Sequence, residues 1–522
     1  MSNPNAAVAD GRPIEKTPGY AWPCLIVSLL AAVSIVFAWM WLPGVTFPVF
    51  KNWLAANNEL FANPANFALL SNVMGLVPIG ALIMALPTTG IVRKWGAKVT
   101  TIVGLLLAII GTAISAATVG SNFYVFLVGR FILGLGLSTT VVAGPTCVSI
   151  WFPDSTRGRA MAIWSCWAPI GIFLSNFVND GVYNMVGQSI ANVQWVWCVL
   201  VVICLIIFAI VFRAPREDER SQVSPVRKPL KEVLYLFKSR QLWCLIIMFL
   251  IFNYMNYAFS QYLKTWLQTP LALGGFGWDA TMAGIWGGLI CACGALAPIG
   301  GLILDKTPRR QKYLCVVVGI CGLTICSALA FQAEFFIPYV IFFCIGNMML
   351  NACCRPLVPT FVAKGGQTAV AFGLSLLTLG QYAGQIATSY VLAPFNDGLT
   401  AASNVAINAK QAVLAAGGTP ADFGPAIGQA VQQAIQEGIS VDPMLAFWAL
   451  VPVGIVGVLL SLGVKPSKEM AAVDNKKDAA DKVEKAEQKE LKEELKEAAP
   501  ADAAVIEETV EVDVESKPDD ES

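Results

Sequence analysis

The sequence predicts an all-α integral membrane protein with twelve transmembrane helices in two six-helix halves, and three observations lead to this fold class. Apolar residue types make up 56% of the 522 residues and charged types only 13%, whereas soluble proteins carry about 25% charged residues. The apolar residues gather into twelve long stretches. Basic residues concentrate in alternate loops between these stretches, as expected for a multi-pass membrane protein.

Each apolar stretch is long enough to cross the hydrocarbon core, which takes about 20 helical residues. The first stretch is too long for the core of a signal peptide and has no small-residue cleavage site after it, so we expect it to remain as a span. The expected spans are 21–42, 67–89, 99–119, 122–151, 160–182, 195–212, 241–263, 280–304, 313–331, 336–358, 369–393 and 443–464.

The loop charges predict the orientation. Segments on the side of the N-terminus carry 21 basic residues before the tail, and the opposite loops carry three, which are Lys51, Lys264 and Lys410. Because basic loops stay in the cytoplasm, we expect both termini there and the chain in the cell membrane, of the bacterial cytoplasmic type.

A charged segment divides the spans into six and six, which predicts two related halves with a binding site between them near the midplane. The expected organisation is a cytoplasmic N-terminal segment, an N-terminal half, a central cytoplasmic loop, a C-terminal half that contains a long outer loop, and a charged cytoplasmic tail. These cover residues 1–20, 21–212, 213–240, 241–464 (with the outer loop at 394–442) and 465–522.

The formal net charge of zero averages two different pieces. Residues 1–464 have nine more basic than acidic side chains, and residues 465–522 have nine fewer. We expect a partly helical or disordered tail that contacts the protein's own basic loops around Arg216–Arg240 and Lys306–Lys312, an attraction that salt would screen.

Catalytic and metal-binding chemistry find no support in the composition. The chain has no histidine, which excludes histidine-based relays, triads and zinc ligands. All 14 cysteines lie in apolar runs, so we expect them to pack as small apolar residues rather than to form disulfides or bind metal. We expect no enzyme activity, cofactor, metal or nucleic-acid partner.

Four motifs stand in register with the twelve spans. They are Gly301-Leu-Ile-Leu-Asp305-Lys306-Thr-Pro-Arg309-Arg310, its counterpart Thr89-Gly90-Ile-Val-Arg93-Lys94-Trp95-Gly96-Ala97-Lys98, the helical Arg130-Phe-Ile-Leu-Gly134-Leu-Gly136, and Trp151-Phe152-Pro153-Asp154-Ser-Thr-Arg157-Gly158-Arg159-Ala160. Together they resemble the major facilitator superfamily over residues 20–464. Two positions depart from the family pattern: Pro308 replaces a glycine, and Arg93 replaces the expected aspartate.

The resemblance implies a cytoplasmic charge cluster that holds one conformation as the halves rock. Its members would be Asp305, Lys306, Arg309 and Arg310, with Arg93 and Lys94 at the equivalent place in the first half. Because Arg93 stands where an acid is expected, an aspartate-based cluster in the first half is in doubt. The alternative is that these basic residues only set the topology.

Ionisable groups inside spans are costly and are therefore candidates for function. Arg130 lies in the fourth span and Arg355 toward the inner end of the tenth, and the resemblance implies that both helices line the central cavity. Because a guanidinium binds a carboxylate through two hydrogen bonds, we expect both to bind an anionic substrate. Alternatively, Arg130 bonds to backbone or neighbouring helices, and Arg355 extends to the cytoplasmic surface.

Neutral polar side chains on the spans are further candidates. Asn253, Asn256, Tyr257 and Gln261 share one face of the seventh span, and Gln381, Tyr382 and Gln385 lie on the eleventh. Such side chains either shape a pocket or join helices. The fifth span adds Trp164, Trp167, Asn176 and Asn179, whereas we expect Trp39 and Trp41 to anchor the first span at the membrane interface.

The sequence therefore predicts a secondary transporter that moves a small organic or oxo-anion by alternating access. Asp180, at the outer end of the fifth span, is the candidate for coupling to protons. One alternative is a proton-coupled drug exporter of the same fold, whose fifth-span signature is poorly matched by Ser165–Ile172. The other is a receptor or scaffold that signals through its tail.

Overall fold

A computed structural model describes residues 17–152, 154–216, 236–307, 311–329, 333–362 and 366–465, and every regular element among them is a helix. The α-helices are α1 (Ala21–Val45), α2 (Phe47–Asn57), α3 (Ser71–Thr118), α4 (Phe123–Trp151), α5 (Asp154–Ser165), α6 (Trp167–Met185), α7 (Ile190–Val211), α8 (Arg240–Gln268), α9 (Ala280–Ala292), α10 (Ala297–Lys306), α11 (Lys312–Leu329), α12 (Phe336–Val362), α13 (Gly366–Val391), α14 (Ala393–Ala415), α15 (Phe423–Gln436) and α16 (Pro443–Ser461).

The predicted all-helical membrane fold is confirmed. Eleven stretches of the described helices are long and apolar enough to cross a bilayer. Two of them, Ala65–Val92 and Lys94–Thr118, lie mostly in α3, which contains a turn at Gly96. The turn needs glycine because its φ is +79°, which other residues adopt only at a cost. The expected span 369–393, the eleventh in order, corresponds to α13, which is not among these stretches. The count of twelve and the cytoplasmic termini therefore stay predictions.

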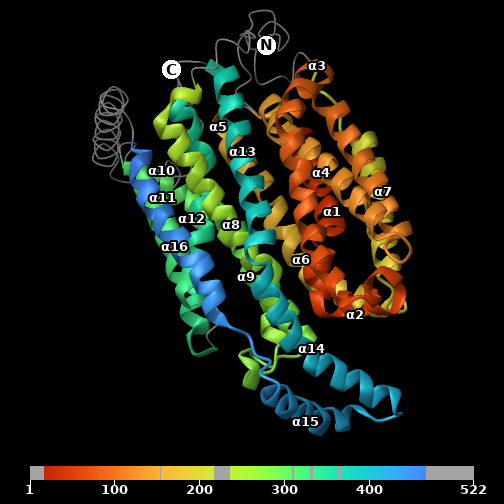
Figure 1. Cartoon of the computed structure of the whole chain (residues 1–522). Helices are drawn as coiled ribbons and strands as arrows, with labels where there is room; N and C mark the ends of the chain where they lie inside the picture. The colour runs from red at the N-terminus through yellow and green to blue at the C-terminus, as the bar shows by residue number, and fades with distance from the viewer. Residues whose placement is uncertain are drawn as a thin grey trace, which may run out of the picture.

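Helices from the two parts of the chain form two groups in space. Figure 1 shows α1, α4 and α7 on one side and α10, α11, α12 and α16 on the other. Helix α5 and the turn within α3 lie at one end of the molecule, while α2, α14 and α15 lie at the opposite end. We call the end that carries α2, α14 and α15 the outer end, following the predicted orientation.

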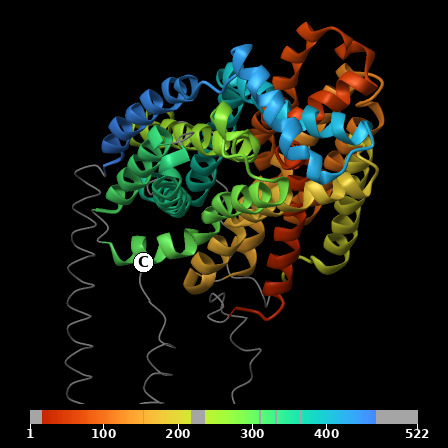
Figure 2. The same cartoon turned by 90° about the horizontal axis from the view of Figure 1, so that it is seen from below.

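The long outer loop contains helices α14 and α15. The Nδ2 group of Asn52 on α2 donates to Oδ1 of Asn404 (3.2 Å) and of Asn408 (2.9 Å) on α14, and Figure 2 shows these helices from the outer end. Before α15, the backbone N–H and hydroxyl of Thr419 donate to Asp422. These bonds lower the pKa of the Asp422 carboxyl. The loop is thus a folded element that joins the two groups of helices.

Close packing of α3 against α4 requires small residues. A Cβ atom at Gly134 would meet the carbonyl oxygen of Val77, and one at Gly136 would lie 2.5 Å from that of Gly104. The two glycines of the Arg130-x-x-x-Gly134-x-Gly136 motif therefore let the backbones of α3 and α4 touch. This contact brings Arg130 against the neighbouring helices.

Two cysteines depart from their predicted role. Cys293 and Cys344 form a disulfide with their Cα atoms 5.1 Å apart, so the expectation that all 14 are packing residues is wrong for this pair. The short helix that contains Cys293 packs directly against α12, which contains Cys344. The two cysteines are 51 residues apart in the sequence, so no local pattern indicated that they are neighbours. The other twelve are thiols.

Candidate functional site

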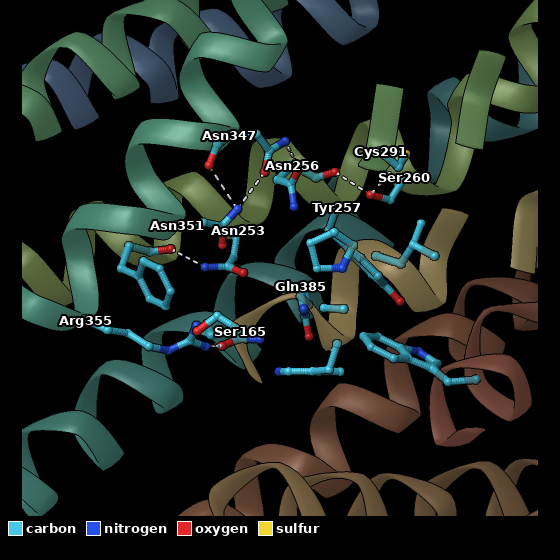
Figure 3. Close-up of a pocket in the computed structure, with 17 residues that line it drawn as sticks. Ser165, Asn253, Asn256, Tyr257, Ser260, Cys291, Asn347, Asn351, Arg355 and Gln385 are labelled. Carbon is cyan, nitrogen blue, oxygen red and sulfur yellow. Dashed lines mark hydrogen bonds between the residues drawn. The ribbon is translucent and has the colours of Figure 1, made fainter. Parts of the chain in front are cut away.

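A polar cavity lies between the two groups of helices. Seventeen residues line it. The lining comes from α1, α5 and α6 of the first half and from α8, α9, α12 and α13 of the second. Figure 3 shows amide, hydroxyl and aromatic side chains directed toward one space. Its location between the halves matches where the sequence analysis expects a substrate site.

Six of the eight residues predicted to bind substrate line this cavity: Asn253, Asn256, Tyr257, Arg355, Gln381 and Gln385. Gln261 does not, because it lies beyond the cavity on α8, where its Nε2 donates to Ser389 Oγ on α13 at 3.5 Å. Arg130 also lies away from the lining. The structure therefore brings together predicted residues from α8, α12 and α13. Of the two predicted arginines, only Arg355 lines the cavity.

The α8 wall follows from helix geometry. Asn253, Asn256, Tyr257 and Ser260 are spaced at i, i+3, i+4 and i+7, which places them on one face, and all four line the cavity. Asn253 Nδ2 donates to the carbonyl of Phe249 at 2.8 Å, and Ser260 Oγ donates to that of Asn256 at 2.9 Å. These local bonds fix the side chains while they remain exposed to the cavity.

The α12 wall contains two residues that the sequence analysis missed. Asn347, Asn351 and Arg355 recur every four residues and so form one face of α12. Asn351 Nδ2 donates to Asn347 Oδ1 (2.9 Å), and Asn347 Nδ2 donates to Asn256 Oδ1 (2.6 Å). A chain of amides thus crosses from α12 to α8. Counting back by four from Arg355 would have found both asparagines.

Arg355 is the one charged side chain among the 17 residues that line the cavity. Its Nη2 donates to Gln381 Oε1 at 3.2 Å, and its guanidinium carbon lies 5.9 Å from the centre of the Phe249 ring. This hydrogen bond uses one of five N–H donors. Nearby, Gln385 Oε1 is buried and has no hydrogen-bond partner among the described residues. The cavity therefore offers a cation beside neutral amides.

The first half supplies aromatic and apolar surface. Trp39 lines the cavity and stacks on Tyr257, with the ring centres 5.6 Å apart. Both Trp39 and Trp41 are buried, at 2% and 0% exposure, so the prediction that they anchor α1 at the membrane interface is wrong. The reason is that α3, α4, α6, α7 and α8 all pack around α1. Every residue from Ala31 to Val45 is buried.

Of the four candidates on the fifth span, only Trp167 lines the cavity. Asn179 Oδ1 accepts a hydrogen bond from the indole N–H of Trp197 on α7 at 2.8 Å. Asn176 Nδ2 donates to the carbonyl of Ile172 at 3.0 Å, and Trp164 is buried against Trp167. Asn179 therefore joins α6 to α7, Trp164 packs α5 against α6, and the Asn176 amide bonds within α6.

Arg130 is fully buried and binds backbone carbonyls. Its Nε donates to Val73 (3.0 Å), its Nη1 to Ala38 (2.9 Å) and its Nη2 to Trp39 (2.8 Å). Pro43, four residues after Trp39, has no N–H to bond the Trp39 carbonyl. Arg130 replaces that missing donor. The structure thus favours the alternative that the sequence left open, in which Arg130 fastens α4 to α1 and α3.

The remaining candidates lie elsewhere. Asp180 is half-buried on α6 and does not line the cavity. Lys94 is exposed, with its Nζ 5.8 Å from the centre of the Trp95 ring. Arg309 and Arg310, and the side chains of Asp305, Lys306 and Arg93, lie outside what the structure describes, as do residues 217–235 and 466–522. The charge cluster and the tail contact therefore stay predictions.

Two groups of membrane-spanning helices around a polar cavity define a multi-pass membrane transporter. The chain belongs to the Major Facilitator Superfamily, because the model of that family matches residues 28–389. The fold is similar to that of a bacterial homolog to the human lysosomal transporter Spinster, in an inward-facing and occupied conformation. The TM-score is 0.55, at 14% sequence identity, over 87% of this chain and 100% of that chain.

Curated relatives share shorter stretches. The low-affinity glucose transporter of Kluyveromyces lactis is 28% identical over 123 residues, which is 24% of this chain and 21% of that protein. Myo-inositol transporter 3A of Cryptococcus neoformans var. grubii is 26% identical over 165 residues, 31% of this chain and 26% of that protein. The chain thus matches about a quarter of the length of these relatives. The family match over residues 28–389 identifies a transporter.

Proposed function

We propose that this protein is a secondary transporter of the cell membrane that moves a small organic anion with one carboxylate and further polar groups. The observation that carries the proposal is the isolated charge of Arg355 in a wall of amides. A guanidinium pairs with a carboxylate through two parallel hydrogen bonds. No acidic side chain is among the 17 residues that line the cavity, so a substrate carboxylate would complete the site.

The amides that line the cavity indicate which other groups the substrate carries. Asn253, Asn351 and Gln385 line the same cavity and offer both donors and acceptors. Hydroxyl groups on a substrate use both. Trp39 and Trp167 add flat apolar surface against which a carbon skeleton packs. A hydroxylated monocarboxylate fits this combination better than an oxo-anion, which has no carbon skeleton to use the aromatic surface.

A neutral polyhydroxylated solute is the second candidate. The Gln385 carbonyl oxygen without a partner and the asparagines around it suit hydroxyl groups, and the curated relatives carry names of glucose and myo-inositol transporters. In that case Arg355 would serve mainly to hold Gln381 in place. The two candidates differ in whether the substrate needs a negative charge.

A ligand panel on the purified full-length protein tests this proposal. A ligand that binds only the folded state raises the melting temperature by mass action. We expect hydroxylated monocarboxylates to raise it, and the corresponding amides and polyols to have little effect. Stabilisation by polyols alone would favour the second candidate, and stabilisation by cationic drugs would favour an exporter.

The Arg355→Gln variant adds a residue-level test. We expect it to lose stabilisation by the carboxylate, while the matched variant Arg240→Gln, at an exposed position at the start of α8, keeps it. If Arg355→Gln responds like the unchanged protein, the anion proposal fails.

A further inference from the structure

Lys264 is a buried lysine that the transport site does not use. The sequence analysis counted it among outer loop charges, but α8 continues to Gln268 and Lys264 lies within it, with 2% of its surface exposed. It does not line the cavity. A fully enclosed ammonium is expensive unless the surrounding structure satisfies it, so its position needs an explanation.

The Lys264 ammonium reaches from the second half to the first. Its Nζ donates to the carbonyl oxygen of Gly44 near the end of α1, and to that of Asn176 on α6 at 3.3 Å. Both acceptors belong to the first half, whereas α8 begins the second. One side chain therefore joins three helices across the boundary between the halves, toward the outer end.

The end of α1 is built to receive a cation. The last carbonyls of a helix lack intrahelical donors and carry partial negative charge, and α1 has no basic residue in its last turn. The chain cannot continue the helix past Val45, because Thr46 has φ +82° and ψ 146°. Lys264 from the opposite half supplies the cationic cap that α1 lacks.

The strained Thr46 supports a conformational role for this corner. A β-branched residue at positive φ is unfavourable and persists only where surrounding contacts impose it. Its hydroxyl is buried with no hydrogen-bond partner among the described residues. The next residue, Phe47, packs against Tyr262 on α8, with the ring centres 5.9 Å apart. Contacts with α8 thus help to hold the corner in this conformation.

We propose that Lys264, Gly44 and Asn176, which we call the outer clamp, hold the two halves together at the outer end. Lys264 is a positioning residue, since it acts on the arrangement of the halves and not on the substrate. When the outer end opens, α8 must move away from α1 and α6, and both hydrogen bonds break. The clamp therefore favours the conformation that is closed at the outer end.

Distance measurements on the full-length protein in lipid nanodiscs test the clamp. Fluorescent amino acids at positions 56 on α2 and 411 on α14, both exposed, report the separation of the halves and avoid thiol labelling in a chain with 14 cysteines. We expect Lys264→Ala to increase the population with the longer separation. The measurement needs no substrate, so its outcome is independent of the proposed anion.

Matched variants make the result specific. Lys410→Ala removes a lysine from α14 that makes no clamp contact, and we expect its distance distribution to equal that of the unchanged protein. Lys264→Gln keeps amide donors on a shorter side chain and should give an intermediate shift, which retains a test if the alanine variant does not fold. An unchanged or shorter separation in folded Lys264→Ala or Lys264→Gln would overturn the proposal.

Discussion

At the scale of single residues, the two arginines inside the membrane have different environments. Arg355 lines the cavity and donates a hydrogen bond to the side-chain amide of Gln381. Arg130 instead donates hydrogen bonds to the backbone carbonyls of Val73, Ala38 and Trp39. The same guanidinium chemistry thus binds backbone in one case and a cavity-lining amide in the other. What separates them is the proline in α1 that leaves a carbonyl without a donor.

Arg130→Lys should reduce stability more than it reduces binding. Lysine cannot reach three carbonyls in different directions, and each buried polar group left without a partner costs about 1–3 kcal/mol. We expect a lower melting temperature with the ligand affinity of the folded fraction nearly unchanged. Thermal unfolding and ligand titration measure the two effects separately. A variant with normal stability and lost binding would contradict this assignment and return Arg130 to the substrate site.

The sequence could predict part of this site, for identifiable reasons. Asn253, Asn256 and Tyr257 were found because one helical face carries them, and polar groups are scarce in a span. The roles of Arg130 and Trp39 depend on which helices surround α1, and no local pattern encodes that. Lys264 was assigned to a loop because a charge normally ends a span. In this chain the opposite half supplies its partners.

At the scale of elements, the corner between α1 and α2 combines strain with a contact from the opposite half. Thr46→Gly should raise the melting temperature, because glycine adopts the observed φ of +82° without the unfavourable conformational free energy of threonine. That cost is on the order of 1–3 kcal/mol. Thermal unfolding measures the gain. Thr419→Gly, at an outer-loop position with φ −105°, is the control and should not stabilise. A destabilised Thr46→Gly would show that the corner is not strained.

Helix α6 carries the residue proposed for coupling. Asp180 lies one helical turn after Asn176, whose carbonyl belongs to the outer clamp. If Asp180 carries the coupling proton, Asp180→Asn abolishes uptake driven by a pH gradient and preserves exchange of substrate at equal pH. Both rates can be followed with labelled substrate in proteoliposomes. Gradient-driven uptake that survives in Asp180→Asn would exclude this role, and the loss of exchange as well would indicate damage to the fold.

At the scale of the whole molecule, we expect the helices up to α16 to carry transport without the tail. The family match ends at residue 389, and the described helices end at Val464. Truncation after Val464 should therefore preserve uptake at close to the full rate, measured per molecule of inserted protein. Loss of uptake by a correctly folded truncated protein would instead support a receptor or scaffold that works through its tail.

The fold as a whole was more predictable than the site. Apolar stretches of span length and alternating basic loops are independent of tertiary contacts, so they predict helices in a membrane from the sequence alone. The contact of α14 in the outer loop with α2 and the Cys293–Cys344 disulfide lay beyond such patterns. In both cases the decisive contacts join residues that are distant in sequence.

The central claim is that the cavity between the halves takes an anion through Arg355. Uptake of a labelled hydroxylated monocarboxylate into proteoliposomes tests it most directly, with the unchanged protein, Arg355→Gln and the control Arg240→Gln reconstituted at equal density. The account predicts saturable uptake that Arg240→Gln retains and Arg355→Gln loses. Equal uptake by all three proteins would contradict it.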